Sequence, residues 1–188
     1  MQRRAVVVPY SDDWPLLFEA ERESLEGALE PWLAGGIHHV GSTAVPGLVA
    51  KPVIDMVAGV ANLGDAAAAR DRLETLGYAY GEHRPEAHLF RKPAGSPWWE
   101  ATHALHLTEP GSDLWRERLA FRDAMRGNAE LAAEYGAWKL ANATGPGAPA
   151  PYAESKTPFV ARVLADVGID VRPDSKRLTR AALARRRA

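Results

Sequence analysis

The sequence contains no cysteine among its 188 residues. This absence excludes disulfide bonds, a thiol nucleophile and a thiolate zinc site, so any metal would need oxygen or imidazole ligands. The chain also lacks a long apolar run, because the run near the N-terminus ends at Pro9 and Tyr10. Such a run is too short for a signal-peptide core or a membrane span. We therefore predict a cytoplasmic protein with no membrane partner.

The chain also lacks a large net charge, and its net charge of -1 points to no class of partner. The exception is the C-terminal tail, residues 171–188, in which seven basic residues stand against Asp174. This tail would suit nucleic acid or another polyanion, but we favour a solvated, partly frayed terminal helix. The remainder, residues 1–170, has the length and composition of a single globular domain.

Hydrophobic periodicity predicts strands mainly in the first half of the chain and helices in the second. Strands are predicted at residues 5–8, 37–40, 53–60, 78–80, 89–92 and 103–107. Helices are predicted from Asp13 to about Trp32, at 65–76, 112–126 and 128–143, and, after a Gly- and Pro-rich loop at 144–151, near 159–167. Gly35 and Gly36 are expected to break the chain before the second strand. The predicted class is α+β, a mixed sheet with flanking helices and a helical C-terminal half.

A short stretch after the second predicted strand carries the residues with the clearest chemistry, Gly41-Ser42-Thr43. Glycine lets backbone N–H groups approach a phosphate without a Cβ in the way, and the Ser42 hydroxyl adds a donor. Lys51 supplies positive charge, and Asp55 on the next strand would hold Mg²⁺ against phosphate oxygens. The structural alternative is that Gly41 allows a tight turn, Thr43 caps a short helix and Asp55 accepts backbone hydrogen bonds.

Together with other short pieces of the chain, this stretch resembles the signature of the GrpB family, over nearly the whole sequence. The other matching pieces are Trp14-Pro15, His106-Leu107, Phe121-Arg122-Asp123, Tyr135 with Lys139, and Tyr152 with Lys156. The family is similar to the nucleotidyltransferase superfamily, so the resemblance implies a nucleotidyltransferase-like fold. It further implies a nucleotide or other phosphorylated small molecule as ligand and Mg²⁺ or Mn²⁺ as cofactor. Three more side chains would then contact phosphate: Arg91, Lys139 and Lys156.

The sequence departs from the superfamily pattern at the second carboxylate, which would lie two residues after Asp55 and is Val57 here. Side chains alternate along a strand, so Val57 faces the same side as Asp55 and offers no metal ligand. Glu109 is a candidate for the third carboxylate. His106 is a candidate metal ligand or general base, whereas His103, three residues earlier, is predicted to face the opposite side of its strand.

Three functions are consistent with these residues. The first is a metal-dependent nucleotidyltransferase with Asp55 and His106 as catalytic residues and Asp55, His106 and Glu109 as metal ligands, although Val57 argues against efficient catalysis. The second is a binding module that keeps the phosphate site without transfer chemistry, because GrpB-like domains resemble an extension of some dephospho-CoA kinases. The third is a polyanion-binding protein that uses the basic tail. The sequence leaves the oligomeric state open.

Overall fold

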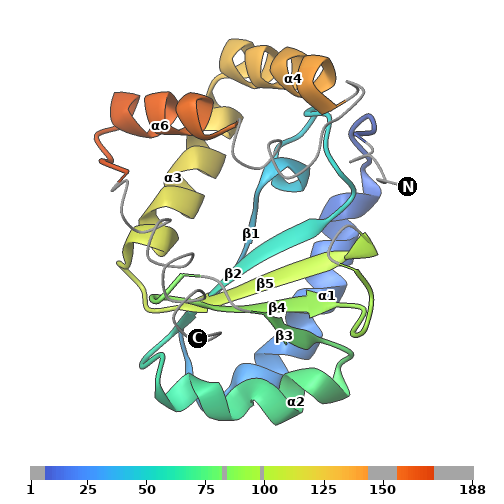
Figure 1. Ribbon diagram of the computed structural model, residues 1–188, viewed down its shortest axis with the longest axis vertical. Coiled ribbons are helices and arrows are strands. Elements are labelled where there is room, and N and C mark those ends of the chain that lie inside the picture. The colour runs from blue at the N-terminus through green and yellow to red at the C-terminus, as the bar shows by residue number, and fades with distance from the viewer. Residues whose placement is uncertain (1–6, 82–83, 98–99, 144–155, 172–188) are drawn as a thin grey trace, which may run out of the picture.

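The computed structural model describes residues 7–81, 84–97, 100–143 and 156–171. Its centre is a five-stranded mixed sheet in the order β1-β2-β5-β4-β3, in which β2 and β5 are parallel and the other neighbours antiparallel. The strands are β1 (Leu33–Val40), β2 (Ile54–Val60), β3 (Ala79–Gly81), β4 (His88–Lys92) and β5 (His103–Thr108). The helices are α1 (Asp13–Leu29), η1 (Ser42–Ala44), η2 (Asp65–Ala69), α2 (Arg70–Thr75), α3 (Asp113–Gly127), α4 (Ala129–Ala143) and α6 (Thr157–Asp166) (Figure 1). The predicted α+β class is confirmed.

Capping residues place several element boundaries where the sequence predicts them. The Ser112 hydroxyl begins α3 by accepting a hydrogen bond from the backbone N–H of Trp115 at 3.2 Å. The Asn128 side chain does the same for Leu131 at the start of α4, at 3.0 Å. Gly77, with a φ of 84°, follows the C-terminus of α2 in the left-handed conformation that favours glycine.

The predicted chain break at Gly35 and Gly36 is wrong, because β1 runs through both glycines. Gly35 lies against Gly59 of β2, and a Cβ on Gly35 would come within 2.9 Å of the Trp115 side chain. Gly36 has a φ of 74°, and the register of β1 on β2 shifts at this point. The two glycines therefore form an irregularity inside the strand and let the backbone and Trp115 pack closely.

Three predicted segments fall partly or wholly outside the described residues. Of the strand predicted at residues 5–8, Val8 forms an isolated antiparallel bridge with Ala50, and residues 1–6 are outside the described part. The loop predicted at residues 144–151 and the basic tail from residue 172 onward are also outside it. The loop and the tail remain predictions.

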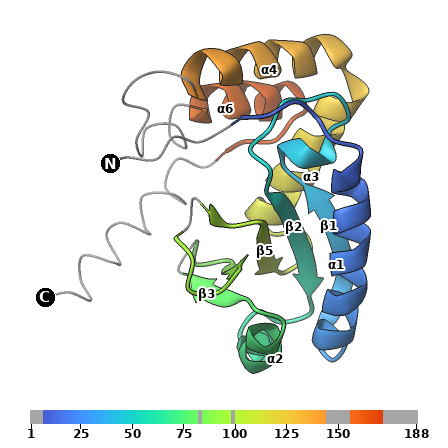
Figure 2. The same cartoon turned by 90° about the vertical axis from the view of Figure 1, so that its right-hand side faces the viewer.

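Different helices cover the two faces of the sheet. On one face, α1 and α2 pack onto the main apolar core, which includes Met56 of β2 and Leu105 of β5. On the other face, Leu114 of α3 packs in a smaller cluster with Val57. Figure 2 shows α1 lying along β1 on one side of the sheet. Because side chains alternate along β2, Asp55 faces the α3 side together with Val57.

A buried polar network ties α1 to the other end of the sheet. The Glu21 carboxylate accepts a hydrogen bond from the Tyr78 hydroxyl at 2.9 Å and forms an ion pair with Lys92 at 3.0 Å. His103 lies 3.8 Å from the same carboxylate, on the α1 side of β5. Burial, followed by the charge of Glu21, raises the pKa of the Tyr78 hydroxyl well above its usual range, so this group stays a donor. The prediction that His103 faces away from His106 is thereby confirmed.

Replacing Glu21 by glutamine should lower the free energy of unfolding by about 2 kcal/mol, because the half-buried Lys92 ammonium loses its counter-charge and the buried Tyr78 hydroxyl loses a charged acceptor. Glu23→Gln, on the exposed side of the same helix, is the matched control and should change stability by less than about 0.5 kcal/mol. Urea denaturation followed by circular dichroism measures both. Equal stabilities for the two variants would show that the network contributes nothing to the fold.

The C-terminal helices build a second core beyond the end of the sheet. Met125 of α3, Tyr135 of α4 and Val163 of α6 are buried together with Leu48 from the loop after η1. The Tyr135 ring stacks on Phe159, with 4.8 Å between centroids. Figure 1 shows α4 and α6 beyond the end of β1 that leads into η1. None of the helices in the described ranges has the length and apolar character needed to cross a membrane.

Candidate functional site

The site begins where β1 ends beside the first residues of β2. Val40, the last residue of β1, pairs with Asp55, so the chain bends directly next to this carboxylate. Gly41 at the bend has a φ of 70°, and a Cβ there would lie 2.6 Å from Oδ2 of Asp55. Ser42 follows as the first residue of η1. The bend and the carboxylate are therefore neighbours in space, as the sequence predicts.

Replacing Gly41 by alanine should lower the free energy of unfolding by roughly 3 kcal/mol, because the new methyl group meets the Asp55 carboxylate in a conformation that L-residues avoid. Gly47→Ala is the matched control. Gly47 also has a positive φ, of 76°, but a Cβ there meets nothing within 4 Å, so it should cost only about 1 kcal/mol. Chemical denaturation measures both variants, and equal losses would show that the Gly41–Asp55 contact carries no constraint.

Strand pairing places Asp55 in a row across three strands. Asp55 of β2 pairs with Ala104 of β5, and Ala104 pairs with Arg91 of β4. Paired residues point to the same face of a sheet, so Arg91 reaches the α3 side together with the carboxylate. The small Ala104 side chain between them leaves room for a direct electrostatic interaction, and the charge of Asp55 does act on Arg91. Lys51, from the loop before β2, joins the same side, and its charge interacts with Asp55.

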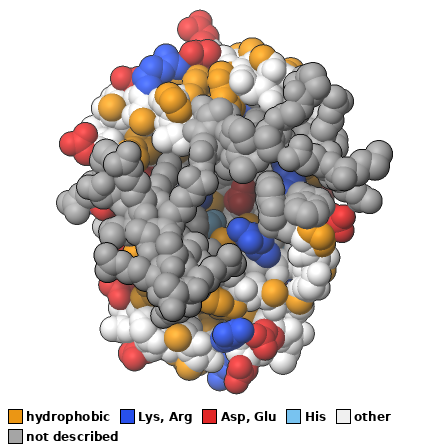
Figure 3. Space-filling view, viewed as in Figure 1, with side chains coloured by type: hydrophobic (Ala, Val, Ile, Leu, Met, Phe, Trp, Pro, Cys, Tyr) orange, Lys and Arg blue, Asp and Glu red, His pale blue; other side chains and the backbone are white. Residues whose placement is uncertain are grey.

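Three further cations reach Asp55 from the helical half of the chain. They are Arg118 of α3, Lys139 of α4 and Lys156, the residue before α6. Burial raises the pKa of the Asp55 carboxyl, while the charges of these residues and of Lys51 oppose that rise. Near the middle of the face seen in Figure 3, acidic, basic and histidine side chains gather in a hollow.

Lys139 links the Ser42 bend to the carboxylate. Its ammonium group donates hydrogen bonds to the Ser42 hydroxyl and, at 3.0 Å, to the backbone carbonyl of Val49. The same group lies 4.6 Å from the centroid of the Tyr135 ring, and the residue is only 3% exposed. Burial, then the charge of Lys156, lowers the pKa of Lys139 to about 7, with Asp55 acting in the opposite direction. The Lys139 amine is therefore partly unprotonated near pH 7 and would gain a proton when an anion binds beside it.

Burial also lowers the pKa of two other cations of the site. For Lys51, the Asp55 carboxylate opposes this effect and the Arg91 charge adds to it. For Arg91, burial is again the main cause, and Asp55 again opposes it. The positive charges thus outnumber the single carboxylate and are partly removed from water, which is the electrostatic setting of an anion site.

The family model described as GrpB protein matches residues 4–166. The chain belongs to the GrpB family. Among curated GrpB relatives, the glutamate-rich protein GrpB of Alkalihalophilus pseudofirmus is 34% identical over 134 residues, which are 69% of this chain and 76% of the relative. The UPF0157 protein YqkA of Bacillus subtilis is 30% identical over 139 residues, 73% of this chain, and the match spans only 39% of that longer relative.

The fold is also found in a solved GrpB structure. The crystal structure of conserved protein GrpB from Enterococcus faecalis superposes with a TM-score of 0.73 at 26% identity, over 86% of this chain and 96% of that one. A weaker match is to the structure of Cid1 in complex with its short product ApU, with a TM-score of 0.45 at 15% identity over 67% of this chain and 39% of that one.

Two predicted site residues of this GrpB chain lie elsewhere. Thr43 is buried, and its hydroxyl donates to the carbonyl of Val53 at 2.9 Å and lies 3.0 Å from Nε2 of His39, so it holds the bend instead of facing a phosphate. Glu109 lies past the far end of β5, about 16 Å along the strand from the residue paired with Asp55. Its carboxylate accepts a hydrogen bond from the Leu63 backbone N–H at 2.9 Å. Both expectations are corrected.

The structure supports the prediction for His106 only in part. It pairs with Val57, so it shares the α3 face with Asp55, but it lies two residues further along β5 and is only 4% exposed. Val57 itself is fully buried against Leu114. Within the described ranges, no three His, Asp or Glu side chains come together as a metal ligand set. The residues of the site therefore do not fit a protein-held pair of metal ions.

Arg118 is the site residue that the sequence analysis missed. Along α3 it takes a place in the row Leu114, Arg118, Phe121 and Met125, whose spacing puts all four on one helix face. The other three members pack in the apolar clusters. A cation in the middle of an otherwise apolar helix face is a signal of a buried electrostatic role, and it was available in the sequence.

Proposed function

We propose that this chain binds a phosphorylated small molecule, with a nucleotide as the first candidate, in the basic site around Asp55. The observation that carries the proposal is the convergence of cations from five separate parts of the fold on one carboxylate. The ligand phosphate would take the place next to Ser42, Lys139 and Arg91, where hydroxyl, ammonium and guanidinium donors are available together.

The balance of charge supports an anion as the ligand. Four basic side chains act on Asp55 directly, and Arg91 interacts with it across the sheet. Burial lowers the pKa of Lys51, Arg91 and Lys139, so the positive charges of these three side chains are costly in the free protein. An anionic ligand would remove that cost, which favours binding of two or more negative charges.

The same residues argue against a resident metal centre. The several cations around Asp55 would repel a divalent ion and offset the attraction of this one carboxylate. Val57 provides no second ligand. The Mg²⁺ or Mn²⁺ predicted from the sequence would then enter with the phosphate groups of a nucleotide, not through a preformed protein site. Nucleotidyl transfer by two protein-held metals is for this reason the second candidate function. Binding of a polyanion through the tail depends on residues outside the described part.

Arg118→Gln should weaken ATP binding by roughly fivefold, because one cation of the site is lost while its shape is largely kept. Arg116→Gln on the same helix is the matched control, since Arg116 is exposed and pairs with Asp113 at 2.6 Å outside the site. Isothermal titration calorimetry with ATP, with and without Mg²⁺, measures the affinity of both variants and of the native chain. Binding in the absence of Mg²⁺ is expected.

Two results would contradict the proposal. The first is no measurable heat with ATP, inorganic phosphate or pyrophosphate, which would leave the basic site without a phosphate ligand. The second is equal loss of affinity in Arg118→Gln and Arg116→Gln, which would place any binding elsewhere on the surface. Strict dependence on Mg²⁺ would favour the nucleotidyltransferase function instead.

A further inference from the structure

The hydrogen bond between Lys139 and Ser42 has a chemical use beyond the binding of phosphate. Lys139 belongs to α4 and Ser42 begins η1, so two distant parts of the chain bring an amine into contact with a hydroxyl. Lys139 is buried, whereas Ser42 is only half-buried. An amine in contact with a hydroxyl is the arrangement in which a base can activate serine as a nucleophile.

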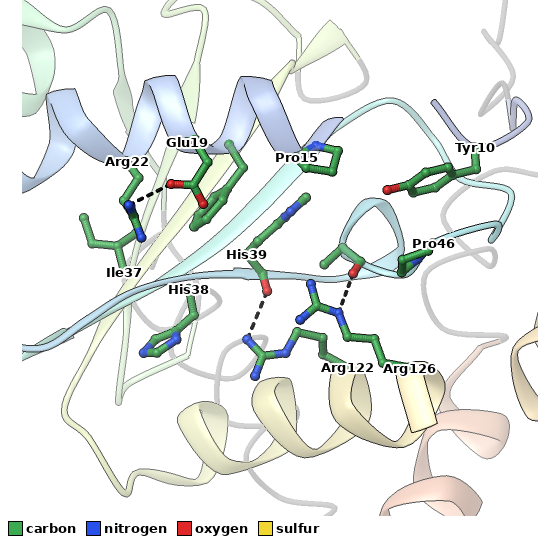
Figure 4. A pocket seen from close by; sticks show the side chains of 12 residues that line it. Tyr10, Pro15, Glu19, Arg22, Ile37, His38, His39, Pro46, Arg122 and Arg126 are labelled. Carbon is green, nitrogen blue, oxygen red and sulfur yellow. Dashed lines mark hydrogen bonds and ion pairs between the residues drawn. The ribbon is translucent and has the colours of Figure 1, made fainter. Parts of the chain in front are cut away.

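The bend that carries Ser42 is fixed by other parts of the chain. The Thr43 hydroxyl donates to the carbonyl of Val53, just before β2, at 2.9 Å. From α3, Nε of Arg126 donates to the carbonyl of Ala44 at 2.7 Å, and Figure 4 shows this guanidinium directed toward η1. The hydrogen bond from α4 adds a third attachment. A hydroxyl on a fixed bend can be held close to the geometry of attack on a bound substrate.

The Lys139 amine is oriented by groups other than Ser42. Its Nζ donates to the carbonyl of Val49 at 3.0 Å and lies 4.6 Å from the centroid of the Tyr135 ring. Burial, then the charge of Lys156, lowers its pKa to about 7, so part of the amine is unprotonated at neutral pH. The unprotonated amine keeps an N–H for the Val49 carbonyl, and its lone pair can accept the Ser42 proton. A base that a third group orients is typical of nucleophilic catalysis.

The cations around Asp55 would stabilise the charge that develops in such a reaction. Attack of a hydroxyl on a carbonyl carbon places negative charge on the carbonyl oxygen. Arg91 and Lys51 interact with Asp55, whose carboxylate lies against the bend at Gly41, directly before Ser42. Their guanidinium and ammonium donors suit the oxyanion of a carbonyl as well as the oxygen of a phosphate.

We propose that Ser42 is a nucleophile and Lys139 its general base, and that they hydrolyse an activated carboxylic ester through an acyl-serine intermediate. Oγ of Ser42 forms a bond to the carbonyl carbon of the ester while the hydroxyl proton moves to Nζ of Lys139. The bond to the leaving group then breaks, and the leaving alkoxide takes that proton. Water next attacks the acyl-serine, and Lys139 accepts a proton from the water and returns it to Oγ. The products are a carboxylic acid and the free serine.

This activity uses the same site as the proposed phosphate binding but does not rest on it. The carbonyl of an ester is uncharged and leaves the Lys139 amine unprotonated. A phosphate or sulfate ion would keep that amine protonated and would occupy the donors for the oxyanion. An anion bound in the basic site should therefore inhibit the acylation of Ser42.

p-Nitrophenyl acetate is the probe, because its cleavage releases coloured p-nitrophenolate and leaves an acetyl group on the protein. The native chain should show a burst of p-nitrophenolate, and peptide mass spectrometry should locate the acetyl group on Ser42. Ser42→Ala should abolish this burst. Lys139→Arg should slow the acylation by at least roughly 100-fold, because a guanidinium cannot accept the proton. Ser24→Ala changes an exposed hydroxyl of α1 and is the matched control, which should keep the native rate.

Three further measurements make the outcome decisive. Hydroxylamine removes an acetyl ester of serine but not an acetyl amide of lysine, and sulfate binding by Lys139→Arg shows that this variant keeps the folded site. Acetylation confined to lysine amides, or equal acylation of Ser42 in the native chain and Lys139→Arg, would overturn the proposal even if sulfate binds normally. The third measurement repeats the acylation with sulfate present. Acylation of Ser42 that depends on Lys139 but is not inhibited by sulfate would support the hydrolase and contradict anion binding beside Ser42.

Discussion

Asp55→Asn should raise the affinity of the basic site for sulfate by roughly 30-fold. The carboxylate competes with any incoming anion for Arg118, Lys156, Lys51 and Lys139. At a separation of about 7 Å and an effective dielectric constant of about 20, one unit charge changes the energy of another by about 2 kcal/mol, which gives this factor. Asparagine keeps the size of the side chain, so the bend at Gly41 should persist.

The same substitution separates the two candidate functions. If Asp55 held a metal ion for nucleotidyl transfer, its loss would lower the affinity for ATP with Mg²⁺. If Asp55 only balances the cations, its loss raises the affinity for sulfate and for ATP alike. Asp65→Asn, an exposed aspartate at the start of η2, is the control and should leave both affinities unchanged. A fall in sulfate affinity in Asp55→Asn would show that the carboxylate is not a competitor of the anion.

Local sequence signals predicted the elements of this fold better than their arrangement. Hydrophobic periodicity and capping residues such as Ser112 and Asn128 act within a few positions of the chain, so they can be read from it directly. The passage of β1 through Gly35 and Gly36 could not, because it depends on the close approach of Gly59 and Trp115 from distant parts of the sequence.

Only part of the site could be predicted from local sequence signals. The bend at Gly41 and Ser42 and the carboxylate at Asp55 lie on adjacent strands, and their proximity follows from a short connection. Arg91 meets Asp55 because β5 lies between β2 and β4 and places Ala104 in the gap. That strand order is a property of the whole sheet and is not written in any short stretch of sequence.

Residues from the helical half entered the prediction by resemblance, not by spacing. Lys139 and Lys156 are far from Asp55 in the chain and reach it because α4 and α6 pack on α3. Arg118 was missed although it interrupts an apolar helix face. The prediction for Glu109 was wrong because the sequence does not show that β5 runs parallel to β2. This direction places the residues after β5 far from Asp55. Long-range packing therefore decides the membership of this site.

The affinity for sulfate should fall by about tenfold for each pH unit above 7. The free protein holds Lys139 with a pKa of about 7, well below the value of 10.5 for an exposed lysine. An anion binds the protonated form, so below pH 7 the charge is already present, and above pH 7 binding must take up a proton. Sulfate keeps its charge over this range, so the slope reports the protein and not the ligand.

Two variants of Lys139 bracket this pH dependence. Lys139→Met is neutral at every pH and should bind sulfate weakly with little slope between pH 6 and 9. Lys139→Arg stays charged and should bind with little slope as well, but more tightly than the native chain at pH 9. A slope that persists in Lys139→Arg would assign the titration to another group. Calorimetry at fixed ionic strength is the measurement, since salt screening would otherwise imitate the effect.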